Sequence, residues 1–289
     1  MITAIVGGIS YPLETIAKLV AHDGWGDSPR HIISDRSSLQ HGDTYIDYRL
    51  DPRKGQFVFR LPLTSLDAMY AARRTLLGIF APQNRISILF VLPYGNRQID
   101  CVALPTEMPW EANAWAAQRI GVTLYCNDPT FYDPDGRAVS FSLGGGGDAG
   151  VIPMLVPEKV GASVLNAIGT VSYTGGADVF PDLIRVTGPI TDYVMTANIT
   201  GDVLDFAGVA IAAGHYVDID PRFGHATVKL DGVTAHPEYL TATSDLATFR
   251  IVAATDGSGL RANSFTVTGS DVTESTAVTM SFFDRFTGI

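Results

Sequence analysis

The stretch Asn127-Asp128-Pro129-Thr130-Phe131-Tyr132-Asp133-Pro134, followed by the glycines at 144–147, divides the chain into two parts of different character. Strand-like segments and one helix precede it, whereas short strands and turns alone follow it. A glycine tetrad is typical of a flexible link. We therefore expect a mainly β protein with a domain at residues 1–140, a Gly-rich linker at 141–150 and a second domain at 151–289.

Length and composition indicate two folded domains with much covered surface. The chain has 289 residues, enough for each domain to bury its own core. Apolar residues make up 46% and charged residues 17%, which excludes a disordered chain. This balance predicts either a compact, core-rich β protein or one whose surface is covered by sister subunits.

The acidic charge argues against stable binding of nucleic acid. The formal net charge is −10, and the 20 Lys and Arg residues are scattered rather than gathered in a basic stripe. Such a surface suits a duct through which DNA slides without sticking, because like charge opposes adhesion. The alternative is that the acidic charge serves solubility.

No segment predicts insertion into a membrane or export. The strongest apolar run, Ile86–Leu92, ends at Pro93 and is far shorter than the ~20 residues that a spanning helix needs. Residues 1–8 have no basic residue before an apolar segment, unlike a secretory signal. We expect folding in a cytoplasm, with Cys101 and Cys126 as reduced, buried thiols.

The first part predicts paired strands, then a helix, then a hairpin. Residues 45–50 alternate as a half-buried strand and residues 56–61 return as another. Thr64 or Ser65 caps a helix with an apolar stripe, and that helix ends at Gly78 and Pro82. The predicted stripe comprises Leu66, Met69, Tyr70, Leu76, Leu77 and Phe80. A turn at 93–96 joins strands at 85–92 and 98–104.

The second part predicts a β-sandwich or barrel. Its turn signals recur at roughly 8–12-residue spacing. Residues 181–190 are predicted as a strand followed by a turn. The other predicted strands cover residues 203–206, 209–211, 216–220, 226–230, 249–252, 264–267 and 277–283.

One strand of the first part predicts a contact between subunits. In residues 119–126, Ile120, Val122, Leu124 and Cys126 form an inner face. Its opposite face carries Arg119 and Tyr125, with Trp115 just before, so it is covered either by a helix or by another subunit. We propose the following interface residues: Arg73, Arg74, Trp115, Arg119 and Tyr125.

The chain carries no motif that predicts catalysis, a metal or a cofactor. There is no Gly-x-Ser-x-Gly elbow, and the glycine tetrad does not continue as a phosphate loop. His215, Asp218, Asp220 and His225 are the best metal-ligand set, but strand alternation separates His215 from Asp218 and Asp220. We therefore expect no enzyme, no metal site and no cofactor.

A carbohydrate-binding module is the rival interpretation. Sugars stack on exposed aromatic side chains of β-sandwiches, and the second part offers Tyr173, Tyr193, Tyr216, Phe223 and Tyr239. All three tryptophans, Trp25, Trp110 and Trp115, lie in the first part, which weakens this interpretation.

Several segments together resemble the distal tail proteins of long-tailed bacteriophages. The apolar strand that runs into Asp128-Pro129-Thr130-Phe131-Tyr132 carries most of the likeness. Residues 180–190, with Arg185-Val186-Thr187-Gly188-Pro189-Ile190, are similar to the family's Pro-x-Ile-x-Val-x-Gly-Pro-Ile pattern. Residues 213–220 resemble its Gly-x-x-Val-x-Ile-Asp segment, and residues 283–289 its aromatic ending.

The resemblance implies an N-terminal β-sandwich-like belt domain with one α-helix and a C-terminal galectin- or CBM-like β-sandwich. It further implies a virion protein, assembled in the host cytoplasm, that forms a hexameric ring at the distal end of the tail. Such a ring joins the tail tube protein to the tail-tip or hub protein of the baseplate and lines the DNA channel, and some members carry receptor-binding proteins. The family has no catalytic residues.

Overall fold

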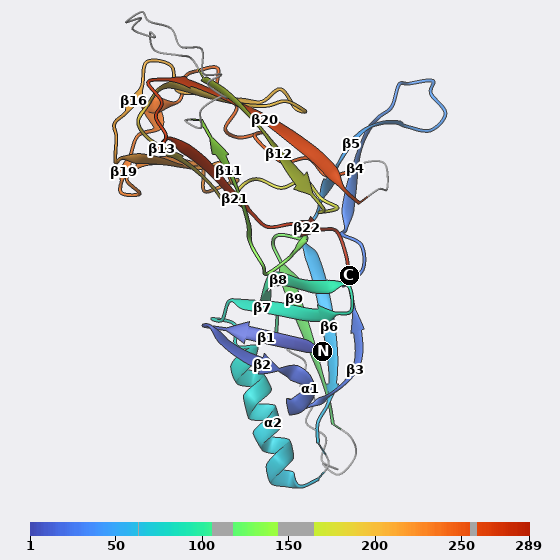
Figure 1. Cartoon of the computed structure of the whole chain (residues 1–289). Coiled ribbons are helices and arrows are strands. Elements are labelled where there is room, and N and C mark those ends of the chain that lie inside the picture. Colours follow the sequence, from blue (N-terminus) through green and yellow to red (C-terminus); the bar gives the residue numbers. More distant parts are fainter. Residues whose placement is uncertain (63, 106–117, 144–164, 255–258) are drawn as a thin grey trace, which may run out of the picture. The chain divides into compact units, whose positions relative to one another are not determined.

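The computed structural model describes residues 1–62, 64–105, 118–143, 165–254 and 259–289 (Figure 1). The protein is mainly β, as predicted. Its contacts divide it into unit 1, Met1–Pro134 with Phe286–Ile289, and unit 2, Asp135–Arg285. Residues 137–142, on both sides of position 140, form one strand of unit 2. Most of the expected linker, residues 144–150, lies outside the described part.

Unit 1 is an antiparallel sheet that turns a corner. Its strands run in the order β2-β1-β7-β8-β9-β6-β3. β8 makes the corner, because its first part pairs with β7 while Val102 and Ala103 pair with β9. The elements in chain order are β1 (Ile2–Val6), β2 (Ile9–Pro12), α1 (Leu13–Ile16), β3 (Lys18–Asp23), β4 (Arg30–Asp35), β5 (Thr44–Leu50), β6 (Arg53–Arg60), α2 (Leu66–Ile79), β7 (Ile86–Leu92), β8 (Gly95–Ala103), β9 (Arg119–Cys126) and β10 (Phe131–Tyr132).

Aromatic rings fill the core of unit 1. Trp25 stacks on Phe57 with ring centroids 4.9 Å apart, and Phe90 lies 5.2 Å from Trp25. The indole lies directly over Gly55, where an added Cβ would come within 2.2 Å of the ring. Only glycine therefore allows β6 to pass beneath Trp25, and this contact fixes the loop that holds Trp25.

The predicted helix forms, but its buried face differs from the prediction. α2 begins after Ser65, one of the two expected caps, and ends at Ile79. The capping-box spacing of Thr64 and Asp67 is not the one that forms. Met69 and Leu76 are buried as expected, together with Ala72 and Ile79. The predicted stripe is wrong at three positions: Leu66, Tyr70 and Leu77 are exposed. These three lie on a neighbouring face of the helix, next to the face that is buried.

Replacing Ser65 with alanine should lower the free energy of unfolding of unit 1 by about 1 kcal/mol. The Ser65 side chain accepts a hydrogen bond from the Ala68 amide at 3.1 Å, and this amide is one of the four at a helix start that have no partner within the helix. Urea unfolding would measure the loss. Thr64→Ala is the matched control, and an equal loss in both variants would contradict the assignment of the cap.

The strand at residues 45–50 is present but is not half-buried. β5 is exposed along both faces and pairs with β4 rather than with β6, which lies between β3 and β9. Alternation of apolar and polar residues usually indicates a strand with one face packed on a core. In β5 the same alternation occurs in a strand with no core beneath it.

Unit 2 is a sandwich of two antiparallel sheets around one core. One sheet has the order β11-β21-β13-β17-β18-β19, and the other has β12-β20-β14-β15 with β16 beside β14. The elements are β11 (Arg137–Ser142), β12 (Leu165–Tyr173), β13 (Leu183–Thr187), β14 (Ile190–Ala197), β15 (Val203–Asp205), β16 (Ala210–Ile211), β17 (Tyr216–Asp220), β18 (Thr227–Leu230), β19 (Thr234–Ala235), the 3-10 helix η1 (Pro237–Tyr239), β20 (Arg261–Ser270) and β21 (Ala277–Phe282). β22 (Arg285–Phe286) stands at the division between the units.

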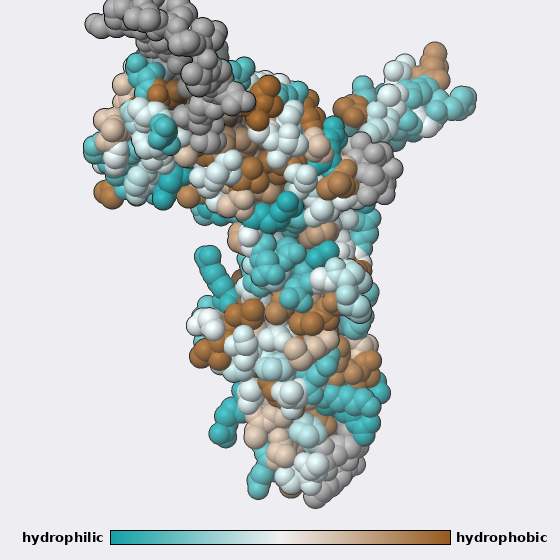
Figure 2. Space-filling model, in the orientation of Figure 1, coloured by the Kyte–Doolittle hydropathy of each residue, from teal (hydrophilic) through white to brown (hydrophobic). Residues whose placement is uncertain are grey.

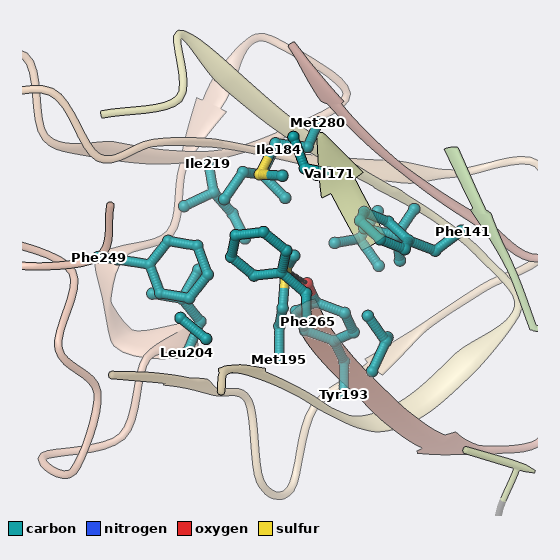
Figure 3. Close-up of a cluster of buried hydrophobic side chains, with 14 of the residues drawn as sticks. Phe141, Val171, Ile184, Tyr193, Met195, Leu204, Ile219, Phe249, Phe265 and Met280 are labelled. Atoms are coloured by element: carbon teal, nitrogen blue, oxygen red, sulfur yellow. Dashed lines mark hydrogen bonds between the residues drawn. The ribbon is translucent and has the colours of Figure 1, made fainter. Parts of the chain in front are cut away.

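Both sheets of unit 2 turn large side chains inward (Figure 3). Ile184, Ile219 and Met280 come from one sheet, and Met195 and Phe265 come from the other. All are buried, which is the two-layer packing that the spacing of the short strands predicts.

One predicted strand of unit 2 is wrong. Residues 249–252 form no strand, and Ile251 makes only an isolated bridge with Val179. The side-chain amide of Asn263 takes the place of a neighbouring strand: it accepts from the Val252 amide at 2.9 Å and donates to the Val252 carbonyl at 3.0 Å. Phe249 and Ile251 are buried, so the apolar pattern correctly indicated the core but not the backbone.

Cys101 and Cys126 are free and buried, as predicted. Among the described residues, no helix is both long enough and apolar enough to cross a membrane.

Candidate assembly surface

Two strands of unit 1 stand apart from its sheet and form what we call the arm, residues 30–50. β4 and β5 pair with each other, and neither pairs with another strand in the described ranges. Figure 1 shows this hairpin extending beyond the ends of β3 and β6. An isolated two-stranded hairpin is marginal in water. A partner surface is therefore the usual means of stabilising one.

The arm exposes large apolar side chains. Ile32 is 63% exposed, Ile46 59% and Tyr48 52%. Ile32 lies opposite Tyr48 across the two strands, so these two share a face, and Ile46 is the extra residue where the register of the pair shifts. Figure 2 shows hydrophobic surface at the far end of the arm, where Leu39 is almost fully exposed. An apolar face of this kind marks an interaction site.

The root of the arm, by contrast, is tightly bonded. The Asp51 amide donates to the Pro29 carbonyl at 2.9 Å, which closes the base of the hairpin. Asp27 accepts from the Arg30 guanidinium at 2.6 Å. Partial burial opposes ionisation of Asp27, but the bonds from Arg30 and from the Ser28 amide hold its pKa below the usual value. The arm is thus exposed along its length but fixed where it joins the sheet.

A second feature is a row of cations on the outward face of the β3-β6-β9 part of the sheet. In the strand register Lys18 of β3 lies opposite Arg60 of β6, and Arg60 lies opposite Arg119 of β9. The three cations are therefore side by side on adjacent strands. None of the three forms an ion pair with another residue that the structure describes. Like charges directly opposite one another are destabilising, so this row favours an acidic partner.

The predicted interface residues fall into three groups. Arg119 and Tyr125 share the outward face of β9, where Arg119 is exposed and Tyr125 is half-buried. Arg73 on α2 reaches Gln118, next to Arg119, with 3.4 Å between Nη1 and Oε1. Arg74 is exposed on α2. Trp115 lies outside the described residues.

The arm as a candidate surface does not follow from the sequence prediction. The alternation in residues 45–50 predicts a half-buried strand with Ile46 and Tyr48 on its inner face. The signal that could have revealed it is charge on both faces of the hairpin. Arg30 shares a face with Ile32 and Tyr48, and Asp47 and Arg49 lie on the opposite face. Whether such a strand has a core beneath it is decided by contacts far along the chain.

Three residues of the possible metal-ligand set, His215, Asp218 and Asp220, are bound by other side chains of unit 2. Asp218 is bound by Arg185 at 2.8 and 3.0 Å, and Asp220 by Arg222. His215 Nδ1 lies 2.7 Å from Asp231, whose pKa is lowered by this hydrogen bond and by the Tyr216 amide. In the described ranges, no group of three or more His, Cys, Asp and Glu side chains is placed to hold a metal ion.

The aromatic residues proposed for sugar stacking are mostly covered. Tyr173 and Tyr193 are buried, and Tyr216 lies under the Arg185 guanidinium at 4.1 Å. Tyr239 stacks on His236 at 4.6 Å. Only Phe223 of the five is freely exposed. A single exposed ring at a turn is not a stacking platform, so these five residues form none in the part of unit 2 that the structure describes.

Comparison with known proteins identifies the fold. No protein-family model matches the chain, and no curated protein matches it in sequence. Among solved structures, the Dit protein of phage SPP1, described as a paradigm of the hub adsorption apparatus of phages that infect Gram-positive bacteria, matches with a TM-score of 0.65 and 14% identity. The match covers 99% of each chain. A chain of the phage P2 baseplate in its activated conformation with Ca matches with a TM-score of 0.44 and 9% identity, over 93% of this chain and 98% of that one. The chain therefore has the fold of a phage distal tail, or Dit, protein, as the resemblance in its sequence predicts.

Proposed function

We propose that the chain is a structural, non-catalytic component of a phage tail. Copies of it form a hexameric ring at the distal end, which joins the tail tube to the tip or hub protein and surrounds the path of the DNA. The likeness to SPP1 Dit over nearly the whole of both chains supports this role. The acidic charge of −10 suits a channel through which DNA moves without adhering.

The arm is the observation that carries the proposal. Its apolar side chains have no cover within the described part of unit 1, and a second copy supplies one. A ring needs two different complementary patches on each subunit, because every copy contacts its two neighbours head to tail. In this proposal the arm is one patch. The other lies in the next copy and includes Arg73, Arg74, Trp115, Arg119 and Tyr125.

The mass of the purified protein tests this function directly. Native mass spectrometry should show a species of six times the 30.9 kDa chain mass, and negative-stain images should show a hollow hexagon. A protein that stays monomeric at high micromolar concentration would rule out the ring. A ring that binds neither tube nor hub protein would leave the assembly correct and its place in the tail wrong.

Replacing Arg119 with glutamate should weaken the ring by roughly tenfold or more in its dissociation constant. Arg119 is one of three adjacent cations, and a carboxylate there would repel the acidic surface that we expect the row to meet. Analytical ultracentrifugation at low and high salt measures the effect. The wild-type ring should also loosen as salt rises, because exposed charge pairs are screened.

Arg85→Glu is the matched control for this charge reversal. Arg85 is an exposed arginine of unit 1 that lies outside both the cation row and the arm. A ring weakened equally by both changes would mean that net charge, and not the row, is responsible.

A further inference from the structure

Arg53 is a fully buried arginine at the root of the arm. It is the first residue of β6 and is 0% exposed. The Phe131 ring lies beneath its guanidinium, 4.7 Å from centroid to Cζ. Burial lowers the pKa of this group, but an arginine starts so far above neutral pH that it stays charged. A buried cation needs compensation from the groups around it.

All five N–H donors of Arg53 meet neutral acceptors. Nε donates to the Pro129 carbonyl at 2.9 Å. Nη1 donates to the Gly24 and Gly26 carbonyls at 3.0 and 2.7 Å. Nη2 donates to Ser28 Oγ at 2.9 Å and to the Thr287 carbonyl at 2.6 Å. The guanidinium is thus fully satisfied, which is what a rigid fork of donors can achieve and an ammonium cannot.

These acceptors come from three segments far apart in the sequence. Gly24, Gly26 and Ser28 lie in the loop that leads into β4, and Arg53 lies where the chain leaves β5. Arg53 therefore joins the entering and leaving strands of the arm. Pro129 belongs to the Asp128-Pro129-Thr130 turn, in which Asp128 Oδ1 accepts from the Thr130 amide at 3.0 Å.

The third segment is Phe286–Ile289, which belongs to unit 1 although most of the preceding 150 residues form unit 2. Besides the Thr287 carbonyl, the Ile289 amide lies 3.4 Å from the Trp25 carbonyl. Gly288 passes so close to Gly26 that an added Cβ would lie 2.6 Å from its oxygen. The Arg97 guanidinium covers the Phe286 ring at 3.4 Å. The segment is therefore built into the root of the arm.

We propose that Arg53 is the positioning residue of the arm and that Phe286–Ile289 completes its site, so that the arm is fixed for docking on a second copy only when this segment is seated. The inference rests on the proposed ring for its purpose. Thr287 follows Arg53 by 234 residues, so a growing chain can close the site only after unit 2 has been synthesised. Assembly through the arm is thereby delayed until both units exist.

Amide hydrogen exchange of residues 24–53 tests the positioning separately from ring formation. We expect Arg53→Met, and a chain lacking 286–289, to speed exchange at the arm root by roughly tenfold or more. The first change removes the charged donor of four carbonyls and a hydroxyl, and the second removes the Thr287 carbonyl and the contact of Ile289 with Trp25. Arg53→Lys should give an intermediate rate, since an ammonium has at most three donors. Arg36→Met, which removes an exposed arginine at the far end of the same hairpin, is the matched control and should leave the root unchanged.

A combined variant makes the test specific for one shared site. If Arg53 and residues 286–289 act together, Arg53→Met in the shortened chain should exchange no faster than the more affected of the two single variants. Root exchange that is unchanged in the shortened chain, or effects that simply add, would overturn the inference. The order of the arm root would then not depend on the seating of residues 286–289 through Arg53.

The ring itself supplies the second readout. In native mass spectrometry, Arg53→Met and the chain lacking 286–289 should each show less hexamer than the unaltered chain. The unfolding transition of unit 2 should stay unchanged in both. If the unaltered chain forms no ring, the proposed function fails, yet the exchange result still decides the role of Arg53. If the shortened chain forms the ring with unaltered affinity, the role in assembly fails and the proposed function stands.

Discussion

Replacing Ile32, Ile46 and Tyr48 together with serine is expected to convert the ring to monomers at micromolar concentration while unit 1 stays folded. These side chains are 52–63% exposed, so each has about half of its surface still to bury in a contact. Full burial of such a side chain contributes about 1.5–3 kcal/mol. Burying the remaining half of each of the three side chains therefore contributes about 2–4 kcal/mol in total. That corresponds to roughly 30- to 1000-fold in the dissociation constant. Sedimentation equilibrium over a concentration series measures it.

The control removes equally exposed apolar groups from unit 2. Phe223 and Val233 are 94% and 84% exposed, and serine at both positions should leave the ring mass unchanged. The circular dichroism spectrum of the arm variant should match that of the unaltered chain, because none of its three side chains belongs to the core. A full-mass ring from the arm variant would show that the contact lies elsewhere.

Local signals were enough to predict several elements of unit 1. The start of α2 lies at Ser65, one of the two expected caps, and the turn at 93–96 joins β7 and β8 as predicted. In β9, Ile120, Val122, Leu124 and Cys126 form the buried face, as the alternation predicts. In these cases the deciding residues lie within a few positions of one another.

β12 and β14 of unit 2 are absent from the predicted strands because their neighbours alter the pattern. β12 places Gly169 where the Phe141 ring lies, since an added Cβ would come within 1.9 Å of that ring. Gly169 therefore interrupts the apolar alternation of the inward face, on which Val171 and Tyr173 are buried. β14 contains a bulge between Thr191 and Val194, with Asp192 at φ 51°, and the bulge shifts the period midway.

The candidate site was predictable only in part for the same reason. The outward position of Arg119 and Tyr125 follows from alternation in one strand. The exposure of Ile32 and Tyr48 depends on β5 having no core beneath it, which no local spacing shows. The site of Arg53 brings together residues 24, 129 and 287, and a sequence pattern does not indicate which arginine among the 20 basic residues will be buried.

Replacing Phe265 with alanine should unfold unit 2 at much lower denaturant and leave the ring intact. Phe265 is buried between the sheets, with ring centroids 6.3 Å from Phe141 and 5.9 Å from Phe249. Removing a buried phenylalanine costs about 3–5 kcal/mol, a large part of the stability of one domain. The proposed ring contacts all belong to unit 1, so the native mass should stay that of the ring.

Two spectroscopic probes separate the units in this experiment. All three tryptophans precede residue 135, so tryptophan fluorescence reports unit 1, whereas far-ultraviolet circular dichroism reports both units. Phe265→Ala should shift the dichroism transition and leave the fluorescence midpoint in place. Ile168→Ala, at a 70% exposed position of β12, is the control and should change stability by less than about 0.5 kcal/mol. Equal shifts in both probes would mean that the units unfold as one, and loss of the ring would place unit 2 among its contacts.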